Sequence, residues 1–163
     1  PTKGIVMSTP TLWRRRELLP LALFALAPAT PLLHAAPPTD IEVWKGPNCT
    51  CCVDWFRHLE ANGFRVRSHD SGNGDARARL KIPLALGSCH TGLVAGYAIE
   101  GHVPAREIRR LLAERPKAVG LAVGGMKLGS PGMDTPVYQG RKEPYDVVLV
   151  LADGSSRVYQ SYR

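Results

Sequence analysis

Strand and helix patterns alternate along this chain, and that alternation limits the fold more than any other feature of the sequence. Each segment shows either the two-residue period of a strand or the 3.6-residue period of a helix. The segments run in the order strand, helix, strand, helix, strand, strand and helix, at residues 41–44, 53–60, 64–69, 75–81, two strands within 91–103, and 104–115. Such an order predicts an α/β domain.

A glycine-rich segment over residues 120–140 follows this alternation and predicts a long loop. Two strand-like segments, 145–151 and 157–162, then flank Asp153-Gly154, a strong signal for a β-hairpin. A chain of 163 residues is of the length expected for one domain, which we place at residues 37–163.

The first 36 residues predict an export signal that is removed from the mature protein. A basic cluster at residues 13–16 precedes an apolar run over 18–33, and small residues follow. Three prolines interrupt the run, which is shorter than the roughly 20 residues of a spanning helix, so we expect no stable membrane anchor. Cleavage is expected near Ala35 or Ala36, after export by the general secretory (Sec) pathway or the twin-arginine pathway. The mature protein is therefore expected to be periplasmic or secreted, in an oxidising compartment.

The charge of the chain argues against nucleic-acid binding. The formal net charge is +7, but residues 37–163 carry only +4, which is too little for a protein that binds nucleic acid through its overall charge. The apolar fraction of 44% exceeds that of disordered chains and is sufficient for a hydrophobic core.

Three of the four cysteines, Cys49, Cys51 and Cys52, lie where the first strand passes into the first helix. The N-terminus of a helix stabilises thiolates, the form of cysteine that binds metals and attacks disulfides. Three interpretations remain open at this point. The cysteines form a soft-metal site, a redox pair Cys49/Cys52 in a thiol-disulfide oxidoreductase, or a disulfide in a binding module. The third thiol, Cys51, favours the metal site, because it would scramble a simple redox pair.

The element order, with cysteines at the first strand-to-helix junction, resembles the thioredoxin and glutaredoxin fold. Four segments give a more specific resemblance: Cys49-Thr50-Cys51-Cys52, Ser88-Cys89-His90-Thr91, Tyr97-Ala98-Ile99-Glu100-Gly101-His102-Val103-Pro104 and Gly129-Ser130-Pro131-Gly132-Met133. Over nearly all of the predicted mature chain, this set resembles the CopG-like family of exported copper-resistance and metal-binding proteins.

The resemblance to thioredoxins implies where the fourth cysteine lies. In that fold the turn before the third strand lies against the cysteine-bearing turn, so Cys89 is expected to face the other three cysteines. Thioredoxins carry a proline in this turn, whereas no proline directly precedes Thr91 here. In thioredoxins that proline shields the dithiol from metals, so its absence favours metal coordination over redox exchange.

Four further residues are candidates for metal ligands or for groups that orient a ligand: His90, His102, Met126 and Met133. The alternatives are a loop role for His90, a core or helix-capping role for His102, and core packing for either methionine. The methionine-bearing loop is also a candidate lid over the site. His58 and His69 have no comparable context, and we expect both to face solvent.

These observations together predict a thioredoxin-like α/β protein that binds Cu(I) through Cys49, Cys51, Cys52 and Cys89. Sulfur bridging would allow several cuprous ions, and the ligands alone would also accept Zn(II). The family resemblance implies sequestration, transfer or redox handling of copper in copper resistance, with other periplasmic copper-handling proteins as partners. This function does not require catalysis. The oxidoreductase and the disulfide-stapled binding module remain as alternatives.

Overall fold

The structure is a computed structural model that describes residues 1, 4 and 37–163. Most of the predicted export signal, including its cleavage point, lies outside the described residues. Within the described part of the chain, no helix has the length and apolarity needed to span a membrane.

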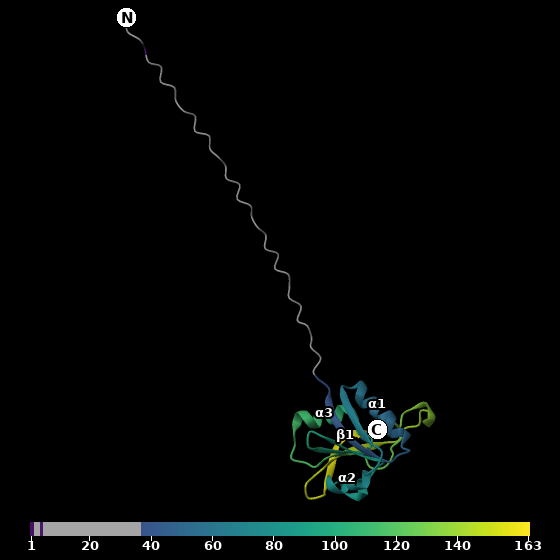
Figure 1. The fold of residues 1–163 in the computed structure, drawn as a ribbon. Coiled ribbons are helices and arrows are strands. Elements are labelled where there is room, and N and C mark those ends of the chain that lie inside the picture. The colour runs from purple at the N-terminus through teal and green to yellow at the C-terminus, as the bar shows by residue number, and fades with distance from the viewer. Residues whose placement is uncertain (2–3, 5–36) are drawn as a thin grey trace. The chain divides into compact units, whose positions relative to one another are not determined.

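The described residues form one mixed sheet with helices on both faces (Figure 1). The seven strands lie in the order β2-β1-β3-β4-β5-β6-β7. The elements are β1 (Thr39–Lys45), α1 (Thr50–Ala61), β2 (Phe64–His69), α2 (Asn73–Arg79), η1 (Leu84–Leu86), β3 (His90–Val94), β4 (Tyr97–Glu100), α3 (Ala105–Glu114), β5 (Gly120–Ala122), η2 (Pro136–Tyr138), β6 (Tyr145–Val150) and β7 (Ser156–Tyr162).

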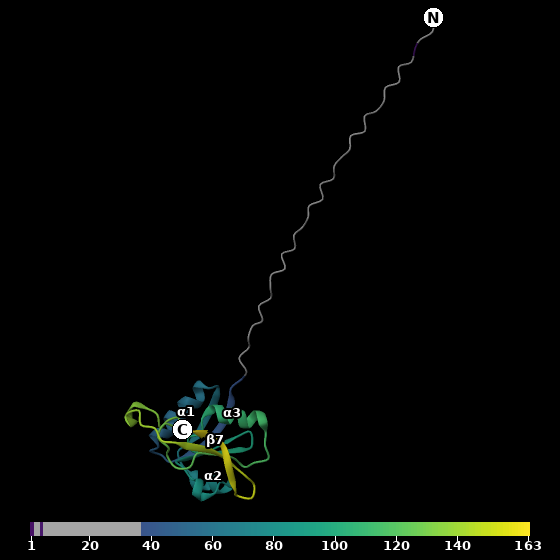
Figure 2. The ribbon, with the colours of Figure 1, turned by 180° about the vertical axis from the view of Figure 1, so that it is seen from behind.

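Helices α1 and α3 cover one face of the sheet, and α2 lies on the other (Figures 1 and 2). The main core lies beneath α1 and α3, where Trp55 and Leu59 of α1 are fully buried with Ile108 of α3. Burial of each such side chain stabilises the fold by about 1.5–3 kcal/mol. A smaller cluster around Ile82 and Ala98 forms the core on the opposite face.

The predicted α/β order is confirmed, and it is broadly consistent with a thioredoxin-like fold. The structure corrects the predicted extent of the long loop, because residues 120–122 form strand β5 rather than the beginning of that loop. This strand joins the N-terminal strands to the C-terminal hairpin, since it pairs with both β4 and β6. Gly120 lies so close to the backbone of Ala98 that a Cβ atom there would collide with it.

The two histidines that we expected to face solvent differ in their surroundings. His69 is exposed, as predicted, and its Nε2 atom lies 2.8 Å from Glu42. The prediction for His58 is wrong: the ring is half-buried, and its Nε2 atom accepts a hydrogen bond of 3.0 Å from the backbone N–H of Ala105. This bond satisfies a donor at the N-terminus of α3 that has no partner within the helix.

The pairing of β1 with β3 determines where the cysteines meet. The strands are antiparallel, and Lys45 at the end of β1 lies opposite His90 at the beginning of β3. The cysteine-bearing turn follows Lys45 directly, and Cys89 directly precedes His90. The register therefore brings two segments about 40 residues apart to the same edge of the sheet.

Candidate metal centre

The structure brings the four cysteines together. Their sulfur atoms lie within 4.8 Å of one another, and the nearest approaches across the two turns are 3.5 Å from Cys52 to Cys89 and 3.9 Å from Cys51 to Cys89. The sulfur of Cys49 lies 3.6 Å from that of Cys51, and Cys49 is the N-cap residue that directly precedes α1. The cluster thus has the compactness that a shared metal site requires, although metal binding by these residues stays a prediction.

Cys49 and Cys52 are joined by a disulfide bond, whereas Cys51 and Cys89 are free. A disulfide sulfur has no thiolate to offer a metal, so coordination by all four cysteines requires prior reduction of this bond by two electrons. The structure therefore corresponds to the oxidised form of the cluster.

The free cysteines differ in their access to solvent. Cys51 is buried and Cys89 is half-buried. Burial, reinforced by the charge of the neighbouring Cys51, raises the pKa of Cys89 to about 12. In the metal-free protein Cys89 is therefore a thiol at neutral pH, and a metal that binds its sulfur must displace the proton.

His102 is fully buried and faces the cluster. Its Nε2 atom lies 3.2 Å from the sulfur of Cys89, and its Nδ1 atom lies 3.0 Å from the carbonyl oxygen of Pro131. Burial lowers the pKa of His102 to about 4, so the ring is neutral. Because a carbonyl oxygen only accepts hydrogen bonds, Nδ1 carries the proton and Nε2 presents its lone pair to the cysteines. A backbone carbonyl orients metal-binding histidines in the same way.

His90 is also fully buried, but only one of its nitrogen atoms faces the cluster. The Nδ1 atom lies 3.3 Å from the sulfur of Cys89, whereas Nε2 has no hydrogen-bond partner among the described residues. The ring packs against Trp55, with their centroids 4.2 Å apart. Burial lowers the pKa of His90 well below its usual value. A neutral His90 can therefore bind a metal or hydrogen-bond to Cys89 only through Nδ1.

The structure separates the two candidate methionines. Met133 is 5% exposed and belongs to the main core, where it fills space between apolar side chains. Met126 is 59% exposed, and it lines the same pocket as Cys89. Of the two, only Met126 combines access to solvent with a place beside the cluster.

A buried carboxylate outside the predicted set of site residues holds the Cys89 turn. Glu100 is fully buried and accepts hydrogen bonds from the backbone N–H of Ser88 at 2.6 Å and from Arg77 at 2.9 Å. Its other oxygen accepts a hydrogen bond from Thr91. Burial raises the pKa of Glu100, while these bonds and the charge of Arg77 oppose that shift. The sequence did contain a signal for this role, because Glu100 is an acidic residue at the end of the otherwise apolar strand β4.

The segment around Gly132 packs directly against the first turn of α1. A Cβ atom on Gly132 would lie 2.6 Å from the carbonyl oxygen of Cys51 and 2.8 Å from the backbone nitrogen of Trp55. The residue also has a positive φ of 85°, which glycine adopts without strain. This close approach holds Pro131, and with it the hydrogen bond to His102, beside the cysteines.

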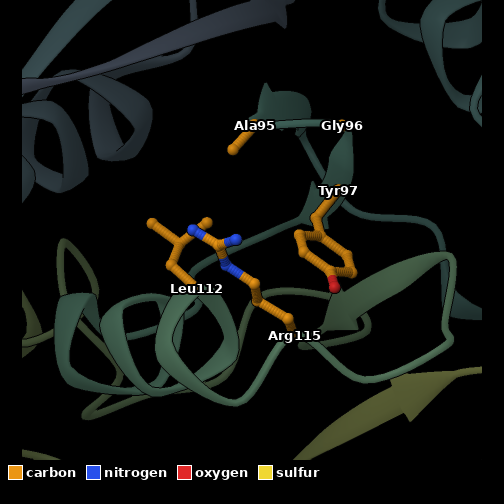
Figure 3. A pocket seen from close by; sticks show the side chains of 5 residues that line it. All are labelled: Ala95, Gly96, Tyr97, Leu112 and Arg115. Atoms are coloured by element: carbon orange, nitrogen blue, oxygen red, sulfur yellow. The ribbon is translucent and has the colours of Figure 1, made fainter.

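The largest pocket described contains none of the cysteines in its lining, which consists of Ala95, Gly96, Tyr97, Leu112 and Arg115 (Figure 3). It has a volume of about 590 Å³ and lies at the turn between β3 and β4, whereas Cys89 precedes the opposite end of β3. Its side chains include Tyr97, Leu112 and Arg115 but no cysteine, histidine or carboxylate. The pocket therefore lacks the ligand types of a metal site.

Comparisons with known proteins give a consistent family assignment. A family described as "Protein of unknown function, DUF411" matches residues 86–133. The solved structure "Copper resistance protein copG- Form 2" is 43% identical with a TM-score of 0.71, over 77% of this chain and 99% of that chain. The "Form 1" structure is 44% identical with the same TM-score, over 77% and 98%. A search of curated proteins found no match. The extent and identity of the two structural matches show that this chain belongs to the CopG copper-resistance protein family.

Proposed function

We propose that this protein binds copper as Cu(I) and sequesters or transfers it in copper resistance. The observation that carries the proposal is the convergence of four cysteine sulfurs within 4.8 Å of one another, with the Nε2 atom of His102 beside them. Thiolates are soft ligands that select Cu(I), and neutral imidazole also suits copper. The proposed ligands are Cys49, Cys51, Cys52, Cys89 and His102.

The number and spacing of these ligands favour a site with more than one copper ion. A single tetrahedral ion uses four ligands, whereas this cluster offers five and a further nitrogen from His90. Sulfur atoms this close together can each bridge two cuprous ions. Zn(II) is the competing metal, because cysteine and histidine together are also its usual ligands.

The family supports copper as the metal, because both structural matches are described as copper resistance proteins. The sequence pattern of the first 36 residues supports action in the periplasm, or outside the cell, after export. We propose other copper-handling proteins of that compartment as the source or recipient of the metal.

Anaerobic titration of the fully reduced protein with Cu(I) tests this function. We expect retention of one or more copper ions per chain by elemental analysis, together with protection of all four cysteines from a thiol reagent. A parallel titration with Zn(II), followed by competition between the metals, tests the preference for copper. Failure to retain copper, or four reactive thiols in the copper-treated protein, would contradict the proposal.

The disulfide bond between Cys49 and Cys52 supports a second candidate function, a thiol-disulfide oxidoreductase. Such an enzyme would use Cys49 as the attacking thiol and Cys52 as the resolving one. It should turn over a mixed disulfide without metal and keep its activity after substitution of Cys51 or Cys89 by serine. The copper site would instead lose ligands in both variants. A module merely stapled by disulfides is less well supported, because Cys51 and Cys89 are free.

A further inference from the structure

A pocket of about 410 Å³ opens beside the cysteine cluster and has Cys89 and Met126 in its lining. Cys89 is half-buried and faces three other sulfurs, whereas Met126 is largely exposed. The pocket thus connects a sulfur atom at the surface with a sulfur atom of the cluster. The thioether of Met126 is not used by the ligand set proposed above.

Two hydrogen bonds hold the segment that carries Met126 against the turn that carries Cys89. The hydroxyl of Ser88 donates to the carbonyl oxygen of Gly125 at 2.5 Å, and the backbone N–H of Gly125 donates to Gly87 at 3.1 Å. Each bond joins the residue before Met126 to one of the two residues before Cys89. The nearness of Met126 to the cluster is therefore built into the backbone.

The burial of the cysteines limits how a metal ion can reach them. Cys51 and Cys52 are buried, with 8% and 0% of their surfaces exposed, whereas Cys49 and Cys89 are half-buried. An incoming ion must therefore first meet the cluster at Cys49 or Cys89. Among the pockets described, only the one at Cys89 has a further soft ligand, Met126, in its lining.

We propose that Met126 is the entry ligand through which Cu(I) reaches the cysteine cluster, an inference that rests on the copper-binding function proposed above. A thioether is neutral and binds Cu(I) without losing a proton, so the exposed Met126 can take the ion from a donor at the surface. The ion then passes to Cys89 by ligand exchange. A copper–thioether bond breaks, a copper–thiolate bond forms, and the thiol proton leaves to solvent. Copper keeps its oxidation state throughout.

The cation in the pocket does not oppose this path. Arg77 also lines the pocket, but its guanidinium lies 2.8 Å from the carboxylate of Glu100 and donates a further hydrogen bond to the carbonyl oxygen of Ser88. The ion pair neutralises the charge of Arg77 locally. Arg77 therefore presents no unpaired positive charge that would repel an incoming cuprous ion.

The test compares the rate of copper loading in Met126→Leu with that in Leu84→Ala. Leucine keeps the size and apolarity of methionine and removes only the sulfur. Leu84 lines the same pocket and is 82% exposed, so its truncation removes apolar surface without removing a soft ligand. Stopped-flow mixing of the reduced full-length proteins with Cu(I) held by a coloured nitrogen chelator gives the loading rate. Elemental analysis gives the final stoichiometry.

We expect Met126→Leu to load about tenfold more slowly than the unaltered protein, with unchanged final stoichiometry, and Leu84→Ala to load at the unaltered rate. Equal rates for Met126→Leu and the unaltered protein would overturn the proposal. Equal slowing in both variants would also overturn it, because the pocket would then act by docking the donor. Absence of copper binding by the unaltered protein would instead refute the underlying function.

Discussion

Glu100 accepts a hydrogen bond of 2.6 Å from the backbone N–H of Ser88, the residue that immediately precedes Cys89. Arg77, which is paired with Glu100, donates to the carbonyl oxygen of the same serine. A buried ion pair thus fixes the peptide groups on both sides of Ser88. This arrangement determines where Cys89 lies relative to the cysteines of α1.

Replacement of Glu100 by glutamine should destabilise the protein and loosen the Cys89 turn. The neutral amide weakens the charge-assisted bonds to Arg77 and Ser88, which should cost about 2 kcal/mol in the free energy of unfolding. Urea unfolding measures that loss, and the rate of Cys89 alkylation measures the loosening. Asp40→Asn is the control, because Asp40 forms solvent-exposed ion pairs with Arg65 and Arg67, and such pairs contribute little to stability. An equal effect of both substitutions would contradict the role of Glu100.

Cys89→Ser should lower the copper stoichiometry or affinity while leaving the fold intact. Cys89 is half-buried, and serine has nearly the same shape, so we expect little change in secondary structure. The site loses the sulfur that approaches both Cys51 and Cys52. Elemental analysis and competition with a Cu(I) chelator measure the change, with circular dichroism as the check on folding. Unchanged copper binding would exclude a site made by all four cysteines.

His102→Gln should weaken metal binding by about tenfold or more, with the hydrogen bond to Pro131 retained. The glutamine amide can still donate to this carbonyl, but the variant has no imidazole nitrogen to direct at Cys89. His69→Gln is the matched control, because His69 is an exposed histidine at the end of β2. Competition titrations of the reduced proteins measure the affinities. Equal affinities in the two variants would show that His102 is not a ligand.

Gly132→Ala should be more damaging than Gly140→Ala. Both glycines have a positive φ, 85° and 70°, so alanine is strained at either position. At Gly140 the added methyl group meets nothing within 4 Å, whereas at Gly132 it meets the backbone of α1. We therefore expect the Gly132 variant to lose about 1–3 kcal/mol more of the unfolding free energy. Urea unfolding measures the difference, and equal losses would show that the close approach is relaxed at little cost.

The metal-free protein should become less stable as the pH falls below about 6.5, partly because of His58. Burial lowers the pKa of His58, so the unfolded chain takes up the proton at a higher pH than the folded protein. Its contribution is fully present above pH 6.5 and decreases as the pH falls toward the folded pKa. Urea unfolding measures the loss of unfolding free energy between pH 7 and pH 5. We expect this loss to be smaller in His58→Gln than in His69→Gln, because the second variant keeps His58. Buried His90 and His102 act in the same direction, whereas Glu100, whose pKa is raised by burial, acts in the opposite direction.

Local sequence patterns predicted most of the secondary structure because those patterns arise within single elements. Alternation of apolar residues identified β1, and helical spacing over residues 53–60 identified most of α1. Strand β5 escaped prediction, since three residues are too few to show a period. Its structure depends on pairing with β4 and β6, which lie in distant parts of the sequence.

The sequence by itself determined the α/β order and the presence of a thiol cluster at the first strand-to-helix junction, because both follow from residues that are neighbours in the chain. The tertiary structure decided which distant groups join that cluster. The tautomer of His102, the clamp of Glu100 on Ser88 and the separation of Met126 from Met133 all depend on burial and on contacts between remote segments. Hydrogen bonding and desolvation are set by the surroundings of an atom, which a linear pattern does not contain.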